Sequence, residues 1–327
     1  LLLFMQLSYA TILNVPDEYA TIQEAIDASV DTDTVLVDQG TYYENLIIQK
    51  NITLTSNAIY DDLTDWAERN TSTGEFEVLN ENIYSTIIDG SADTNGDSLQ
   101  SVIFINAPEC IEPIIFGFTI TGGDGTATIE IIEGEEVIRY RGGGFLAIDA
   151  LPEFHYNYIY NNKGTDSSPI HSGGGGDETS GVDLPTLPDY EWGNPRCEGN
   201  VDLSYNFYRD NDALYGNTLA ATDFTGSIDM THSIFDVYNC PDTTVTPVWV
   251  DIEEEVEVDF TYSAGDLCSI TEDVWVSPDG DDYLNTGTSE SNAFQTIETA
   301  LALIDPDSLN AITINLTEGT FSPSTTG

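Results

Sequence analysis

Short apolar runs separated by polar turns dominate the chain. Val35–Val37, Leu46–Ile48 and Ile52–Leu54 are rich in valine, isoleucine and leucine, and polar residues or a glycine stand between them. Runs of three to five such residues bounded by turn-forming residues are typical of short β-strands. The pattern therefore predicts an all-β architecture for most of the chain.

One early segment has a different period. Ile22, Ala25 and Ile26 follow the i, i+3, i+4 spacing of an amphipathic helix. Thr21 and Glu24 stand at the two positions of a capping box, in which each side chain satisfies a backbone amide of the first turn. We therefore expect a short capping helix near the N-terminal end of the β-rich region.

A repeat emerges from pairs of apolar residues that stand five positions apart. The four pairs are Ile115/Ile120, Phe154/Ile159, Leu203/Tyr208 and Met230/Phe235. The third residue after the first member of each pair is, in order, Phe118, Asn157, Asn206 and Ser233. The pairs are offset by 39, 49 and 27 residues, which indicates a coil of about 27 residues with insertions of variable length. Coils of two short strands and a turn bury their inner faces only by stacking, so the repeat predicts a parallel β-helix.

The start of this pattern recurs late in the chain. Thr296–Leu301 resembles Thr21–Ile26, and Glu318–Phe321 resembles Gln39–Tyr42. We therefore expect a second module of the same kind that is incomplete at Gly327, in a natural protein that continues further.

These patterns predict a domain order. Residues 1–10 precede a first β-helix over 11–240, a linker or edge segment over 241–273, and the start of a second β-helix over 274–327. Insertions are expected at 58–82, where a helical turn is predicted near Asp61, at 126–141, which has the pattern of a β-hairpin, and at 163–200. The last insertion is rich in glycine, serine and proline and is predicted to be a long loop.

The first ten residues have the character of an export signal. Leu1–Leu7 is largely apolar, and Ser8–Ala10 follows the small-x-small pattern of a cleavage site. This segment is interpreted as the remnant of a signal peptide, with a short buried strand as the alternative. Export would place the protein outside the cell or on its surface.

Net charge limits the partners of the chain. It has 7 Lys and Arg against 58 Asp and Glu, a formal net charge of −51. Nucleic acids and anionic lipids are recognised through clustered basic residues, so both are excluded as expected partners. The acidity is compatible either with solubility of an exported protein or with attraction of cations such as Ca²⁺. No apolar stretch is long enough to predict insertion into a membrane.

Several of these segments resemble a known group of proteins. Val15–Ile26, Val35–Tyr42 and Thr86–Gly90, together with Gly117–Gly122, resemble right-handed parallel β-helix proteins of the pectin-lyase-like superfamily. The coil at Gly142–Phe145 is similar to the glycine-rich coils of surface proteins of the polymorphic outer-membrane type. The resemblance implies a right-handed parallel β-helix solenoid, and it leaves activity open because the superfamily contains lyases, esterases, hydrolases and non-catalytic adhesins.

The resemblance also directs the search for catalytic groups. Lyases of this superfamily use a basic residue to abstract a proton, with Ca²⁺ and arginine neutralising the substrate's carboxylate. The candidates here are Arg139, Arg141 and Asp149, which are also interpretable as ordinary charges of a hairpin. No ordered match to the paired aspartates and arginine of an esterase is found, and the three histidines lack metal-ligand spacing.

An aromatic stripe is a second candidate site. If Phe154 and Ile159 point inward, the intervening aromatic residues lie near the outer face. This predicts columns of rings, and their faces would suit the apolar faces of sugars. The alternative is that the insertion at 163–200 folds over them. The candidate ligand-binding residues are Tyr156, Tyr158, Tyr160, Tyr205 and Phe207.

Two oxygen-rich loops are candidate Ca²⁺ sites, although no cofactor is required by the sequence. Their candidate ligands are Asp93, Asn95, Asp97, Asp279, Asp281 and Asp282. Ordinary polar turns are the alternative, because neither loop has the closing glutamate of an EF-hand. The four cysteines are too scattered for a zinc site, and Cys240 with Cys268 is the first expected disulfide pair.

Three functional hypotheses follow. The first is an exported, monomeric β-helix module, part of a longer chain, that binds an extended carbohydrate such as a polysaccharide or cell-surface glycan, or another cell-surface partner, without catalysis. The second is a polysaccharide lyase or glycoside hydrolase, and the third is a structural spacer. With only seven basic residues, an acidic polysaccharide is a poor candidate ligand unless Ca²⁺ bridges it.

Overall fold

The computed structural model defines the architecture over most of the chain. It describes residues 10–70, 73–92, 99–132, 135–164, 177–180, 198–213, 216–222, 225–236, 248–250, 256–265, 270–282, 285–304 and 311–321. The proposed signal remnant at residues 1–9 lies outside this described part of the chain.

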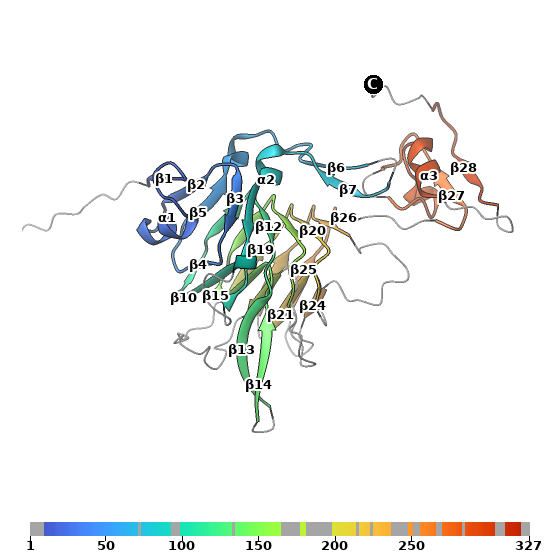
Figure 1. Cartoon of the computed structure of the whole chain (residues 1–327). Helices are drawn as coiled ribbons and strands as arrows, with labels where there is room; N and C mark the ends of the chain where they lie inside the picture. The colour runs from blue at the N-terminus through green and yellow to red at the C-terminus, as the bar shows by residue number, and fades with distance from the viewer. Residues whose placement is uncertain are drawn as a thin grey trace, which may run out of the picture.

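Three parallel sheets form the main body (Figure 1). Sheet A contains, in spatial order, β1 (Ile12–Val15), β2 (Thr34–Val37), β5 (Thr53–Ser56), β11 (Ile114–Phe116), β16 (Glu153–His155), β19 (Glu198–Asp202), β22 (Thr225–Asp229) and β25 (Val256–Asp259). Sheet B contains β3 (Gly40–Tyr43), β8 (Thr86–Asp89), β12 (Thr119–Thr121), β17 (Tyr158–Tyr160), β20 (Phe207–Arg209), β23 (Ile234–Phe235) and β26 (Ala264–Gly265). Sheet C contains β4 (Leu46–Ile48), β10 (Ile103–Ile111), β15 (Phe145–Ala150), β18 (Asp177–Ser180), β21 (Leu219–Thr222) and β24 (Val248–Val250).

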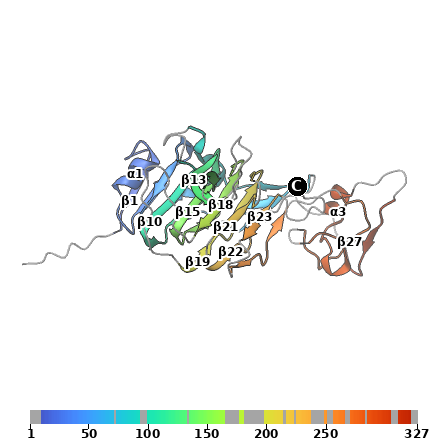
Figure 2. The ribbon, with the colours of Figure 1, turned by 90° about the horizontal axis from the view of Figure 1, so that it is seen from below.

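The order of the strands along the chain makes these sheets a solenoid. From β2 onward the chain visits sheet A, then sheet B, then sheet C, and returns to sheet A one coil further along. Every pairing between neighbouring coils is parallel, and Figure 2 shows the strands of successive coils side by side. The fold is therefore the parallel β-helix that the sequence predicted.

The five-residue apolar spacing determines the register of the stack. Ile115 pairs with Phe154 in sheet A, and Ile120, Ile159, Tyr208 and Phe235 follow one another across sheet B. All of these side chains are buried and belong to one continuous core that runs along the inside of the coils. The first residue of each pair therefore lies in, or directly after, a strand of sheet A, and the second lies in a strand of sheet B, with one tight turn between them.

Buried amide groups connect the turns between sheets A and B. The amide oxygen of Asn157 accepts a hydrogen bond from the backbone N–H of Phe118 at 3.0 Å. Asn206 accepts from the backbone N–H of Asn157 at 3.0 Å, and the Ser233 hydroxyl accepts from the N–H of Asn206 at 3.2 Å. We call this row the asparagine ladder. It occupies the position that the sequence repeat singled out.

A second row of the same kind lies one strand later. Asn162 accepts from the N–H of Gly123, and Asn211 accepts from the N–H of Asn162, both at 3.0 Å. Their side-chain amides donate to the carbonyl groups of Ile120 and Ile159. The coils of β17 and β20 therefore have hydrogen-bonded asparagines at both ends of their sheet B strands.

The short helix α1 (Ile22–Ala28) forms where the capping box predicted it, with the Thr21 hydroxyl accepting from the N–H of Glu24. Two charged side chains on either side of β4, Glu44 and Lys50, form hydrogen bonds with the two ends of the helix. The Glu44 carboxylate accepts from the N–H groups of Ile22 and Gln23, each at 2.9 Å. Lys50 donates to three carbonyl groups at the C-terminal end. These placements match the polarity of the helix dipole and join α1 to the neighbouring coil.

The insertion at 58–82 covers the outer face of sheet B. It comprises η1 (Asn57–Tyr60), the antiparallel hairpin of β6 (Ala67–Arg69) and β7 (Phe76–Val78), and α2 (Glu81–Ser85). Residues 61–66, expected to form a helical turn, adopt an irregular path instead. Apolar side chains of the insertion and of sheet B form a satellite core, whose buried members are Ala58, Trp66, Phe76, Ile83, Phe207, Ile234 and Ala264.

Two of the expected boundaries differ from the structure. Residues 177–180, inside the expected long loop at 163–200, form β18 and pair with β15 and β21. Strands β24, β25 and β26 lie in the segment expected to be a linker, yet they continue all three sheets, so the described stack extends to Gly265.

The remaining insertion forms as expected. β13 (Gly125–Ile132) and β14 (Glu135–Arg141) make an antiparallel hairpin, and β9 (Leu99–Gln100) pairs with β13. The glycine-rich coil that follows has a steric cause. Gly142 and Gly216, each three residues before aligned strands of sheet C, have φ values of 59° and 66°, and a Cβ there would collide with a backbone carbonyl. A further one-turn helix, η2, spans Gly90–Ala92.

Residues 274–316 repeat the beginning of the chain. β27 (Val274–Val276) pairs in parallel with β28 (Ile314–Leu316), and η3 (Glu290–Asn292) and α3 (Ile297–Leu303) lie between them. Thr296 caps α3 through the N–H of Thr299, as Thr21 caps α1. Of the helices in the described part of the chain, none combines the length and apolar character required to cross a membrane.

Replacing a rung of the asparagine ladder tests whether it holds the coils together. Asn206 is fully buried, and Asn206→Ala leaves the N–H of Asn157 and the carbonyl of Phe154 without these partners and removes one of the two acceptors of the Asn157 amide, so we expect a loss of about 3–5 kcal/mol. Differential scanning calorimetry measures the change. Asn200→Ala, at an exposed position of the same coil, is the control and should shift the melting temperature little. Equal effects of the two variants would contradict this role.

Acid sensitivity at the N-terminal coil provides a second test. The buried Asp33 carboxylate accepts from the N–H of Val30 and from the N–H and hydroxyl of Thr11, and these hydrogen bonds lower its pKa below the ordinary 3.8. A lowered folded-state pKa stabilises the fold above pH 4, and this contribution disappears as the pH falls through the folded-state value. Asp33→Asn should therefore reduce the melting temperature at pH 7 and progressively less below pH 4. Asp17→Asn, at an exposed position, is the control, and a pH-independent difference would contradict the assignment.

Candidate functional site

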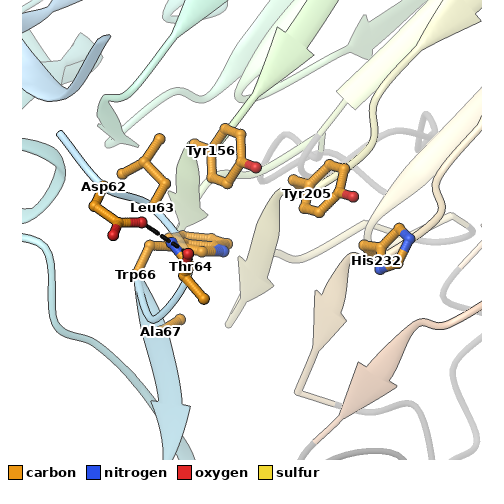
Figure 3. A pocket seen from close by; sticks show the side chains of 8 residues that line it. All are labelled: Asp62, Leu63, Thr64, Trp66, Ala67, Tyr156, Tyr205 and His232. Carbon is orange, nitrogen blue, oxygen red and sulfur yellow. Dashed lines mark hydrogen bonds between the residues drawn. The ribbon is translucent and has the colours of Figure 1, made fainter. Parts of the chain in front are cut away.

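A hollow of about 490 Å³ opens between the insertion and the turns that join sheet A to sheet B. Figure 3 shows the rings of Tyr156, Tyr205 and His232 in a row, facing the segment that precedes β6. The lining residues are Asp62, Leu63, Thr64, Trp66, Ala67, Tyr156, Tyr205 and His232. Two parts of the chain that are distant in sequence therefore form its walls.

One wall is a column of stacked rings, one from each coil. Tyr156 and Tyr205 have ring centroids 5.1 Å apart with planes 20° from parallel. Tyr205 and His232 are 4.6 Å apart at 4°, and His232 and Tyr262 are 5.0 Å apart at 21°. We call these four side chains the aromatic column. Its spacing is that of the strands in a parallel sheet, about 4.8 Å.

The backbone places these rings in the column. Tyr156, Tyr205, His232 and Tyr262 have φ values of 57°, 60°, 58° and 62°. This left-handed conformation turns the chain sharply from sheet A into sheet B, and it strains any residue other than glycine. In the preceding coil, Gly117 occupies the same position with φ 79°, and a Cβ there would lie 2.8 Å from Ala58 and Ser56. The column therefore begins at Tyr156, where η1 no longer covers the turn.

The stacking decides which part of each ring can meet a ligand. The faces of Tyr205 and His232 are covered on both sides by neighbouring rings of the column. A ligand in the hollow therefore meets ring edges, tyrosine hydroxyls and imidazole nitrogens. The expectation that these rings present flat faces to sugars is corrected for the interior of the column.

The other wall comes from the irregular segment of the insertion. The Asp62 carboxylate accepts from the hydroxyl of Thr64 at 2.7 Å and from its N–H at 3.1 Å. These hydrogen bonds, that of the hydroxyl first, hold the pKa of Asp62 below its ordinary value of 3.8. Trp66 is 5% exposed and meets Tyr156 edge to face at 5.7 Å, so it joins the two walls at the base of the hollow.

The five aromatic residues proposed from the sequence separate into two groups. Tyr156 and Tyr205 line the hollow. Phe207 is only 1% exposed within the satellite core, which removes it from the ligand-binding candidates. Tyr158 packs on Phe207 at 4.9 Å, and burial raises its pKa to about 12. Tyr160 is half-buried and stacks on Tyr158 at 4.8 Å, away from the lining of the hollow.

The cover over these aromatics is the insertion at 58–82, through Trp66 and Phe76. The sequence had indicated residues 163–200 for this role, and much of that segment, 165–176 and 181–197, lies outside the described residues. The insertion also reaches along the stack, because the Arg69 guanidinium donates to the carbonyl of Gly265 at 3.0 Å.

The candidate catalytic residues do not gather at the hollow. Arg141 ends β14 and is 5% exposed, so its guanidinium is withdrawn from solvent. Arg139 lies in β14 opposite Thr128, and Asp149 lies in β15. The side chains of Arg139 and Asp149 lie outside the described part of the structure.

The candidate metal ligands lie in two places. Asp93, Asn95 and Asp97 fall outside the described residues, so a Ca²⁺ site there stays a prediction. The Asp282 carboxylate accepts from the N–H groups of Gln295 and Thr296 and thereby holds the start of α3. Asp279 and Asp281 lie in the same turn region, and within the described ranges no three His, Cys, Asp or Glu side chains form a group that could hold a metal ion.

Sequence reasoning missed half of the column and one wall of the hollow. His232 and Tyr262 could have been found, because the segments that begin at Asp202, Asp229 and Asp259 share the order acid, apolar, hydroxyl, aromatic. Asp62, Thr64 and Trp66 carried no such signal, since they reach the column only through the path of the insertion.

Comparison with known proteins supplies no family for the chain. No family model matches it, and no curated protein matches it. Among solved structures, a pectin methylesterase mutant in complex with a hexasaccharide is 10% identical, with a TM-score of 0.31 over 89% of this chain and 94% of that one. The pectin methylesterase from Aspergillus niger is 14% identical, with a TM-score of 0.29 over 94% of this chain and 84% of that one. The rice weevil enzyme is 12% identical, with a TM-score of 0.28 over 77% and 88%.

Interrupting the column tests its contribution to stability. His232→Ala removes two stacked contacts and keeps the strained backbone, so we expect a loss of about 1–3 kcal/mol in thermal unfolding. His232→Tyr restores a ring at the same position and should retain most of the stability. If both variants unfold at the same lowered temperature, the stacking is not what stabilises these turns.

Proposed function

We propose that this chain is a non-catalytic carbohydrate-binding module of the parallel β-helix fold. The observation that carries the proposal is the open hollow between the insertion and the aromatic column. Its volume lies within the range of roughly 300–1,000 Å³ that is typical of small-ligand sites.

The chemistry of the lining supports a polyhydroxylated ligand. Tyrosine hydroxyls can donate and accept, whereas the Asp62 carboxylate and the Thr64 hydroxyl, which already donates to Asp62, can accept. Leu63 and Ala67 supply apolar surface for the C–H groups of a sugar ring. A carbohydrate requires this mixture of hydrogen-bonding groups and small apolar patches. The row of rings along the coils suits an extended chain over a compact one.

We propose a non-catalytic module because of the charged residues that line the hollow. Glycoside hydrolysis ordinarily requires two carboxyl groups that flank the scissile bond. Among the residues that line the hollow, Asp62 is the one carboxylate, and neither lysine nor arginine joins it. The lining thus lacks the paired acids of a hydrolase and the arginine that neutralises the substrate's carboxylate in a lyase.

An exported location belongs to the proposal. Cys110 is disulfide-bonded, and disulfides persist mainly in oxidising compartments. The apolar start of the sequence supports the same location. Cys240 and Cys268 lie outside the described residues, so their pairing stays a prediction.

A glycan array followed by calorimetric titration tests the proposal. Tyr205→Phe deletes one hydroxyl from the hollow and keeps the stacked ring, and it should weaken binding about two- to tenfold. Tyr262→Phe is the matched control, because Tyr262 belongs to the column but does not line the hollow, and it should bind like the wild type.

Two outcomes would contradict the proposal. One is the absence of binding to every glycan on the array. The other is the release of reducing ends or unsaturated products from a bound polysaccharide, which would show that the module is an enzyme.

A further inference from the structure

The position of Asp62 determines the charge at the mouth of the hollow. The carboxylate is held by two hydrogen bonds from Thr64, one from the side chain at 2.7 Å and one from the backbone at 3.1 Å. Both bonds converge on one carboxylate oxygen, Oδ1, so the second oxygen is not engaged by Thr64. Figure 3 shows this side chain on the wall opposite Tyr156 and Tyr205.

Asp62 keeps its negative charge over the ordinary range of pH. Hydrogen bonds from the Thr64 hydroxyl and N–H lower its pKa below 3.8, so the carboxylate is ionised in neutral and mildly acidic solution. Asp62 is exposed, so water and salt moderate its influence on groups more than a few ångströms away.

No lysine or arginine of the lining offsets this charge, and His232 is the one histidine there. The nearest arginine in the insertion's sequence, Arg69, is buried, lies over the ring of Phe76 at 4.8 Å and donates to the carbonyl of Gly265. Arg69 therefore packs against the satellite core and is not among the residues that line the hollow. The formal net charge of −51 adds to the negative potential around the site.

We infer that Asp62 is a specificity-determining residue, which makes the hollow accept uncharged sugars and reject uronic acids and other anionic sugars. The inference rests on the proposed carbohydrate-binding function and names its substrate class. A neutral sugar can donate a hydroxyl hydrogen to the carboxylate, whereas a uronate brings a like charge to the same place. Thr64 is the positioning residue that fixes the direction of the carboxylate.

A matched pair of ligands isolates the effect of charge. A neutral hexose oligosaccharide that binds the wild type is oxidised at C6, which gives the uronate form of the same chain. The dissociation constants of both forms are measured by titration calorimetry. We expect the wild type to bind the neutral form at least about fivefold more tightly, and 1 M NaCl should diminish this ratio.

Asp62→Asn removes the charge and keeps the size of the side chain. This variant should bring the ratio of the two dissociation constants close to one, mainly by admitting the uronate form. Asp65→Asn is the control. It removes one charge from the same exposed segment, but Asp65 does not line the hollow, so the wild-type ratio should persist.

The outcomes separate the two proposals. If the wild type binds no glycan, the proposed function is overturned. If the wild type binds a neutral glycan but binds its uronate form equally well, the inference about Asp62 is overturned while carbohydrate binding stands. An unchanged ratio in Asp62→Asn, or an equal change in Asp65→Asn, also overturns it.

Discussion

Stacking in register is the constraint on which the rest of this structure depends. In a parallel β-helix each residue faces its counterpart in the next coil, about 4.8 Å away, so every position must tolerate a similar neighbour above and below. Asn157 and Asn206, both fully buried, meet this condition, because each side-chain amide accepts from a backbone N–H of the preceding coil and donates to a carbonyl of that same coil. These bonds satisfy backbone groups that the turn removes from the sheets.

The same constraint brings acidic side chains of neighbouring coils close together, so their like charges repel. The structure reduces this repulsion through local hydrogen bonds. Asp202, Asp229 and Asp259 face one another across neighbouring strands of sheet A. Each carboxylate accepts from the N–H group two residues further along, and at Asp259 the added hydroxyl of Thr261 lowers the pKa. The imidazole of His155 lies 3.7 Å from Glu153 and 3.8 Å from Asp202. Local hydrogen bonds thus let a chain of charge −51 place like charges in register.

Sequence and structure agree where a contact repeats from coil to coil. The five-residue spacing identified Phe154 and Ile159 as inward residues and aligned Tyr158 with Phe207, which are direct partners in sheet B. A repeat reveals such positions because the same packing demand returns in every coil. The cap at Thr21 was predictable for a different reason, since its hydrogen bond spans only three residues.

Contacts made once in the molecule left no such pattern. Whether an aromatic side chain remains accessible depends on the path of the insertion, and that path is set by Trp66, Phe76 and Arg69. Their partners are distant in sequence, up to the 196 residues that separate Arg69 from Gly265. Periodicity therefore located Tyr156 and Tyr205 of the column, whereas the burial of Phe207 and the role of Asp62 required the structure.

The aromatic column is not in itself a sign of ligand binding. A left-handed tyrosine or histidine costs about 1 kcal/mol or more relative to glycine, and stacked neighbours offset a cost of this size. Stability alone is thus a sufficient reason for rings at these positions. The hollow is a different matter, because packing favours closed contacts. At Gly117 the insertion closes over the turn, while at Tyr156, Tyr205 and His232 it leaves half-buried ring edges facing Asp62 and Thr64. An apolar segment in place of residues 62–64 would have covered these edges, so the open and polar wall is the feature that points to a ligand.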